Sequence, residues 1–171
     1  MSLTSSTRVI DVGAGTGLLG LALAGDVGAL VLAEPSAGML EVLHEKLASG
    51  GPSNVTVTAF DVLADPPPGE PFDLAISLLV LHHLPDTVAA LSAIRRLLGP
   101  GGRVALADLD AEDGSFHGPD AEGVYHQGFD RADLARLAGA AGLVDVEVRT
   151  ATEIESEGRC YPMFLLLGRR P

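Results

Sequence analysis

The sequence predicts an α/β fold: a doubly wound, mostly parallel seven-stranded sheet with helices on both faces and a C-terminal antiparallel strand. Two observations support this prediction. Between residues 8 and 109, short apolar runs alternate with segments of helical periodicity, which indicates successive strand–helix–strand units and a mainly parallel sheet. From Val144 on, two further strand patterns follow each other with no helix between them, which permits a closing antiparallel pair.

Five elements are expected before residue 61. Their predicted ranges are a strand over 9–12, a helix over 18–24, a strand over 29–33, a helix around 39–47 and a strand over 55–60. In the second helix Met39, Leu40, Leu43 and Leu47 fall on one face, and the glycines and proline of 50–52 end it. The proline-rich stretch 64–71 predicts a loop.

The second half of the chain continues the alternation around one apolar strand. Phe72–Leu78 reads as a strand buried on both faces and therefore as the middle of the sheet. A helix beginning at Pro85 follows, with Val88, Leu91 and Ile94 at helical spacing. The remaining expected elements are a strand over 103–109, a long loop over 110–127 that can cover a site, a helix from the capping residue Asp130 to about 141, and strands over 144–149 and 163–167.

The composition predicts one soluble domain over residues 1–171. With 47% hydrophobic residues, a chain of 171 residues suffices for one core, and two domains would be crowded. The apolar runs 75–81 and 164–167 are far shorter than the roughly 20 residues that cross a bilayer. A formal charge of −12 without a basic patch argues against nucleic acid and membrane partners. With a single cysteine, Cys160, and no export signal, we expect a cytoplasmic monomer or homodimer.

A glycine-rich turn follows the first strand, with the sequence Asp11-Val12-Gly13-Ala14-Gly15-Thr16-Gly17. Such a turn between a strand and a helix lets a ligand approach the backbone closely and directs amide groups at it. Its spacing differs from that of dinucleotide-binding loops, because Leu18 stands where their third glycine belongs. A phosphate-binding Walker loop is excluded because no lysine follows at the required place.

With four later features, the turn resembles the D/E-x-G-x-G-x-G motif of class I S-adenosylmethionine-dependent methyltransferases. These features are an acid after the second strand, an acid after the third, an apolar segment with two histidines after the fourth, and a glycine-rich turn before the fifth: Glu34, Asp61, residues 77–84 and residues 98–102. They occur in the family's order, and the match covers roughly residues 9–108. Five ordered features are much more specific than the glycine turn alone.

The resemblance implies S-adenosylmethionine as the cofactor. Glu34 corresponds to the acid on the ribose hydroxyls, where a carboxylate can accept both hydroxyl protons. Asp61 corresponds to the acid near the adenine amino group, and Asp11 can attract the cationic methionyl end. The complete expected cofactor set is Asp11, Gly13, Ala14, Gly15, Gly17, Glu34, Pro35, Met39, Asp61, Val62, Ser77 and Leu78. Ordinary alternatives stay open: a solvated acid for Glu34, a turn cap for Asp61 and a core residue for Met39.

The implied reaction is methyl transfer to a small-molecule acceptor, for which positioning alone can supply much of the catalysis. If the acceptor must lose a proton, we expect His82 to take it and Asp108 to orient His82 or the substrate. His82 and its neighbour His83 are expected to point in different directions. His117 and His126 belong to the loop that can cover the site, and no metal is expected.

One departure from the family pattern concerns the start of the chain. Family members usually carry helices before the first strand, whereas the first strand here begins by Arg8, so most of this cap is expected to be lacking. Cover for the site is then expected from residues 110–127, from a partner chain or from a segment outside this sequence. Two other functions stay open: a methyltransferase-like module that binds the cofactor without catalysis and, disfavoured by Leu18, an NAD-dependent oxidoreductase.

Overall fold

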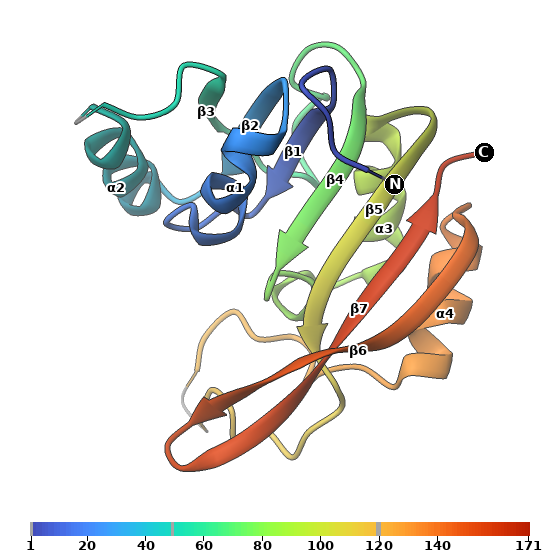
Figure 1. Cartoon of the computed structure of the whole chain (residues 1–171). Helices are drawn as coiled ribbons and strands as arrows, with labels where there is room; N and C mark the ends of the chain where they lie inside the picture. Colours follow the sequence, from blue (N-terminus) through green and yellow to red (C-terminus); the bar gives the residue numbers. More distant parts are fainter. Residues whose placement is uncertain (1, 49, 119–120) are drawn as a thin grey trace.

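The computed structural model describes residues 2–48, 50–118 and 121–171, which form one sheet with helices packed against it (Figure 1). The elements in chain order are β1 (Arg8–Val12), α1 (Leu18–Leu23), η1 (Ala24–Asp26), β2 (Ala29–Glu34), α2 (Ala37–Ala48), β3 (Val55–Ala59), β4 (Phe72–Leu78), η2 (Leu81–His83), α3 (Thr87–Leu97), β5 (Leu98–Leu109), α4 (Arg131–Ala140), β6 (Val144–Ser156) and β7 (Arg159–Arg169).

The strand order is β3-β2-β1-β4-β5-β7-β6. Strands β1 to β5 pair in parallel, and β7 is antiparallel to both of its neighbours, β5 and β6. Six strands therefore run in one direction and only β7 opposes them. The predicted fold class is confirmed, and β4 lies in the middle of the sheet as expected.

Helices cover both faces of the sheet (Figure 1). In β1, Val9 belongs to the core beneath α1 and α2, whereas Ile10 belongs to the larger core that includes α3 and α4. This alternation arises because successive side chains of a strand point to opposite faces. Asp130 caps α4 as predicted, since its side chain accepts hydrogen bonds from the backbone N–H groups of Ala132 and Asp133.

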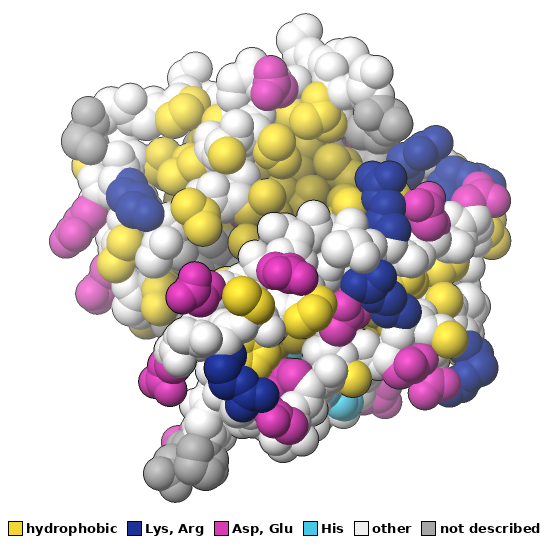
Figure 2. Space-filling view, turned by 60° about the horizontal axis from the view of Figure 1, so that its bottom comes forward, with side chains coloured by type: hydrophobic (Ala, Val, Ile, Leu, Met, Phe, Trp, Pro, Cys, Tyr) yellow, Lys and Arg dark blue, Asp and Glu magenta, His cyan; other side chains and the backbone are white. Residues whose placement is uncertain are grey.

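One part of the sheet has an apolar face that is not covered by any helix of the described residues. A hollow of about 390 Å³ opens there, lined by Leu74, Ala105 and Leu167 from β4, β5 and β7 together with Leu3. Figure 2 shows hydrophobic side chains gathered in a hollow beside a group of basic residues. In the part of the chain that the structure describes, no helix is long and apolar enough to span a membrane.

The C-terminal hairpin is longer than the sequence predicted. We expected strands over 144–149 and 163–167, whereas β6 and β7 continue to a two-residue turn at Glu157 and Gly158. Both turn residues have positive φ, 51° and 77°, which is the backbone of the tight turn that matches strand twist. The hairpin therefore extends past the end of β5, where it reaches the segment that follows this strand (Figure 1).

Strand β5 also begins earlier than predicted, at Leu98 instead of Arg103. Leu98 pairs with Phe72, and the register then shifts before Leu74 pairs with Arg103. The glycine-rich turn therefore forms an irregular start of the strand. In addition, α1 ends at Leu23 and passes into a 3-10 turn, one residue before its predicted end.

The segment after β5 has no helix or strand among its described residues, as predicted for the loop over 110–127. Residues 119–120 lie outside the described part of the chain. The two ends of the segment are held together by an isolated bridge between Asp110 and Phe129.

Candidate functional site

The glycine turn after β1 requires glycine for two different reasons. Gly13, Gly15 and Gly17 all have positive φ, at 69°, 54° and 79°, a conformation that other residues rarely adopt. A Cβ atom on Gly13 would lie 2.5 Å from a methyl group of Val80, so the two segments can only meet here without a side chain. A Cβ atom on Gly15 would meet nothing within 4 Å, because this residue faces open space.

Glu34 ties the glycine turn to the end of β2. Its side chain is buried, and its Oε2 accepts a hydrogen bond of 2.8 Å from the Gly15 backbone N–H. Its Oε1 accepts another of 2.9 Å from the Ser36 backbone N–H. A carboxylate oxygen can accept more than one hydrogen bond, so both oxygens can still receive a ligand hydroxyl.

A cavity of about 640 Å³ opens at the carboxyl ends of the parallel strands, where open α/β sheets bind ligands. It brings together eight of the twelve residues expected to bind the cofactor, drawn from four separate stretches of sequence. These eight are Gly13, Gly15, Glu34, Pro35, Met39, Asp61, Val62 and Leu78.

Three of these residues had an ordinary structural alternative, and the burial of Glu34 excludes a solvated acid there. Met39 is 42% exposed and faces the cavity, so it is not a core residue of α2. Asp61 does act as a turn cap, because its Oδ1 accepts a hydrogen bond of 2.8 Å from the Leu63 backbone N–H. It also lines the cavity, so the capping role and a ligand contact are compatible.

The other four expected residues, Asp11, Ala14, Gly17 and Ser77, do not line the cavity. Asp11 is buried, and its Oδ2 accepts a hydrogen bond of 2.9 Å from the Gly20 backbone N–H in α1. Burial raises the pKa of Asp11 to about 7, although the bond from Gly20 works against this shift. Ser77 donates from its hydroxyl to the Val12 carbonyl, 2.8 Å away. Asp11 and Ser77 thus support the turn from beneath.

Behind the cavity, His82 and Asp108 form a fully buried pair. The His82 Nδ1 lies 2.6 Å from the Asp108 Oδ1, and their side chains are 1% and 0% exposed. Asp108 also accepts hydrogen bonds from the backbone N–H groups of Leu109, at 2.7 Å, and of His82 itself, at 3.2 Å. Because a carboxylate accepts hydrogen bonds, His82 Nδ1 carries the proton and Nε2 has an unprotonated lone pair.

Two further histidines surround His82. The His117 Nε2 lies 2.9 Å from the His82 Nε2, and the ring centroids of His82 and His83 are 4.1 Å apart. The two rings lie side by side, although His82 is buried and His83 is exposed. They lie on a 3-10 turn, where neighbouring side chains are separated by about 120° and not by the 180° of a strand.

The segment over 110–127 is anchored directly on these histidines. The backbone N–H groups of Tyr125 and His126 both approach the His82 carbonyl, at 2.9 Å and 3.2 Å. The His126 Nε2 lies 3.0 Å from the Leu84 carbonyl. One end of the segment therefore rests on η2, and Tyr125 reaches the wall of the cofactor-sized cavity.

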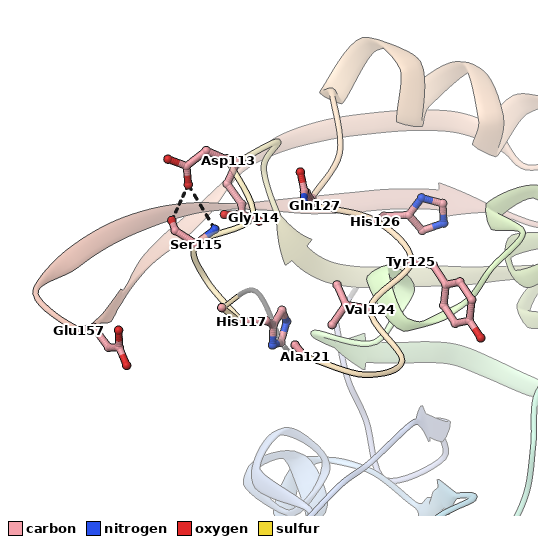
Figure 3. A pocket seen from close by; sticks show the side chains of 13 residues that line it. Asp113, Gly114, Ser115, His117, Ala121, Val124, Tyr125, His126, Gln127 and Glu157 are labelled. Atoms are coloured by element: carbon pink, nitrogen blue, oxygen red, sulfur yellow. Dashed lines mark hydrogen bonds between the residues drawn. The ribbon is translucent and has the colours of Figure 1, made fainter.

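The long hairpin supports the other end of this segment. The Ser115 hydroxyl lies 2.9 Å from that of Tyr161, and Arg159 makes a 3.0 Å ion pair with Asp113. The segment and the hairpin tip enclose a second hollow of about 920 Å³. Figure 3 shows Asp113 and Ser115 on one side of this hollow and His117 on another.

Sequence reasoning missed several residues of the cavity wall, including Leu79, Val80, His83 and Tyr125. Leu79 has a φ of 57°, a strained value for leucine, at the point where β4 ends and the chain turns across the cavity. Backbone strain leaves no mark in a sequence. His83 could have been found from its place beside His82, but its direction depends on the 3-10 turn.

The fold and the cavity define the chain as an α/β domain of the class I methyltransferase type. A family model described as a methyltransferase domain matches residues 9–102, and the chain belongs to this family. A ubiquinone biosynthesis O-methyltransferase of Thiobacillus denitrificans is 32% identical over 159 residues, which cover 85% of this chain and 68% of the relative. An uncharacterised methyltransferase of Anoxybacillus flavithermus is 37% identical over 61% of this chain and 48% of the relative. The chain thus spans only about half the length of some curated relatives.

Solved structures share the fold over almost the whole chain. The YcgJ protein of Bacillus subtilis has a TM-score of 0.80 at 18% identity, covering 98% of this chain and 93% of that one. A phosphoethanolamine N-methyltransferase 2 of Haemonchus contortus, solved with S-adenosylhomocysteine and phosphomonomethylethanolamine, has a TM-score of 0.79 at 18% identity. This chain is covered completely in that comparison, and it matches 50% of the Haemonchus protein.

Proposed function

We propose that the chain binds S-adenosylmethionine in the 640 Å³ cavity and transfers its methyl group to a small-molecule acceptor. The observation that carries this proposal is the convergence of the glycine turn, Glu34 and Asp61 on one cavity. Family membership and relatives named as O-methyltransferases support the same reaction class.

The cavity offers the chemistry that the cofactor requires. Glu34 supplies charged acceptors for ribose hydroxyls, and Gly15 leaves open space where a side chain would intrude. Val62 and Leu63 provide apolar surface for a flat base, with Asp61 beside them for an amino group. When bound, S-adenosylmethionine supplies a methyl group on a cationic sulfur that leaves as a neutral thioether.

His82 is the group placed to receive a proton from the acceptor. Its Nε2 lone pair is unprotonated because Asp108 holds the proton on Nδ1, and the carboxylate stabilises the imidazolium that proton transfer creates. His117 occupies the place next to Nε2. An acceptor therefore reaches His82 only by taking the place of His117, so residues 110–127 control access to the base.

Calorimetric titration with S-adenosylhomocysteine tests the cofactor site. We expect binding with one site per chain, and no heat with NAD under the same conditions. In a separate thermal unfolding experiment, a melting temperature raised by NAD and not by S-adenosylhomocysteine would instead support an oxidoreductase.

The release of S-adenosylhomocysteine during incubation with phenols, amines and carboxylates tests the transfer. Acceptors with a hydroxyl group, such as phenols, are the first choice, because relatives are named O-methyltransferases. Tight cofactor binding without turnover on any acceptor would support a binding module that lacks catalysis.

A further inference from the structure

Three histidines from two separate segments converge at the edge of the cavity. His82, His83 and His117 each place a ring nitrogen within 4.8 Å of the nitrogens of the other two. His82 and His83 belong to η2, whereas His117 comes from the segment after β5. The convergence is therefore made by tertiary structure, and the spacing of these residues in the sequence does not predict it.

Two of the three rings are oriented by acceptors on their Nδ1 atoms. Asp108 lies 2.6 Å from the Nδ1 of His82, and the Gly123 carbonyl lies 2.8 Å from the Nδ1 of His83. A hydrogen-bond acceptor beside Nδ1 keeps the ring proton on that nitrogen and leaves the Nε2 lone pair unprotonated. Metal-binding histidines are characteristically oriented in this way by a carboxylate or a backbone carbonyl.

The electrostatic surroundings also favour a cation among these rings. Asp108 adds a buried carboxylate behind His82, and Glu112 acts on His117 from the same segment. Three imidazoles backed by negative charge form a ligand set suited to a divalent transition metal ion.

We propose that His82, His83 and His117 form a binding site for one Zn²⁺-like metal ion, with Asp108 as the residue that positions His82. In a tetrahedral zinc site the ligand nitrogens lie about 3.4 Å apart, given zinc–nitrogen distances of about 2.0–2.1 Å. The His82–His117 distance of 2.9 Å is close to this value, and the exposed rings of His83 and His117 can adjust. Three histidine ligands leave a fourth position for water or another small ligand.

The metal site does not require the proposed methyl transfer, but the two compete for one atom. The lone pair on the His82 Nε2 can accept a proton or bind a metal ion, but not both at once. A bound ion would also join η2 to the segment after β5 through His117, and so hold that segment over the strand ends. These consequences do not require the cofactor.

Calorimetric titration of the full chain with zinc chloride, without cofactor, tests this proposal. We expect one ion per chain, and a loss of affinity of at least about tenfold in His83→Ala and in His117→Ala. Both side chains are exposed, so these substitutions spare the core. The matched control is His44→Ala, which removes an exposed histidine from α2 and should leave zinc affinity unchanged. Asp108→Asn should weaken binding about 10- to 100-fold, the usual cost of losing a partner that orients a ligand.

A second measurement keeps the result interpretable if a variant is less stable. Zinc should raise the melting temperature of the wild type and of His44→Ala, but much less that of His117→Ala. Equal zinc affinity in wild type and in the His83→Ala/His117→Ala double variant would overturn the site, as would the absence of zinc binding by the wild type. Titration with S-adenosylhomocysteine is run separately, so failure of the metal site and failure of the proposed function are distinguishable.

Discussion

Replacing Glu34 should weaken cofactor binding through two effects that the structure separates. In Glu34→Ala the ribose hydroxyls lose charged acceptors, and such hydrogen bonds contribute about 1.5–3 kcal/mol each. The backbone N–H groups of Gly15 and Ser36 also lose their partner, so the glycine turn is no longer tied to β2. We expect the binding free energy of the cofactor to fall by at least about 1.5 kcal/mol. A fall close to about 3 kcal/mol corresponds to roughly a hundredfold increase in the dissociation constant.

The assay is calorimetric titration with S-adenosylhomocysteine, with Glu41→Ala as the control. Glu41 is an exposed acid on α2, so its removal changes the net charge equally without touching the cavity. Glu34→Gln keeps one acceptor oxygen and should lose less affinity than Glu34→Ala. If the dissociation constants of Glu34→Ala and Glu41→Ala for S-adenosylhomocysteine agreed within threefold, Glu34 would not belong to the cofactor site. Urea unfolding of each variant shows whether any loss comes from a damaged fold.

Four further substitutions test other parts of the site. Gly15→Val should abolish cofactor binding while the fold is largely retained. The added side chain enters the open space that the cofactor is expected to fill, and the φ of 54° disfavours a branched residue. Tight cofactor binding by this variant in calorimetry would refute the assignment of the glycine turn to the cofactor site. His82→Ala should lower turnover on a confirmed acceptor roughly a hundredfold, because the general base is lost. Asp108→Asn should have a smaller effect that is not additive with it. Full turnover by His82→Ala would leave positioning as the whole mechanism. Burial raises the pKa of Asp11 to about 7, so its contribution to stability is complete below about pH 4 and is lost as the pH rises through 7. The free energy of unfolding in urea should therefore rise for Asp11→Asn relative to the wild type by at most about 4 kcal/mol between pH 4 and pH 8. A difference between the two proteins that does not change with pH would contradict the raised pKa of Asp11.

The parts of the fold that follow from local sequence were predicted well. The apolar run 72–78 forms β4 in the middle of the sheet, with Ala75, Ile76 and Ser77 buried, and the helical spacing after Pro85 corresponds to α3. The glycine turn and the acid at the end of β2 were predicted for the same reason, because the end of each parallel strand lies at one edge of the sheet. In such a fold, chain order and strand direction together place these residues near one another.

The features that the sequence did not predict depend on contacts between distant segments. The outer half of the β6–β7 hairpin is mostly exposed, so its alternation of side chains carries little apolar signal. The extra length of the hairpin has a structural role only together with the segment after β5, which the hairpin contacts through Tyr161 and Arg159. The same contacts position His117, and no local pattern around this histidine indicates that it meets His82.

The two halves of the candidate site therefore differ in how firmly the fold holds them. On the cofactor side, Glu34 and the glycine turn are fixed by backbone hydrogen bonds to parallel strands with buried side chains. On the acceptor side, His82 is equally rigid, but the group next to its reactive nitrogen belongs to a segment without regular structure among its described residues. Cofactor affinity should thus depend mainly on the sheet. Acceptor access and metal binding should depend on whether His117 stays beside His82. Substitutions at the hairpin contact, such as Arg159→Ala, should therefore alter acceptor access and metal binding and leave cofactor affinity unchanged.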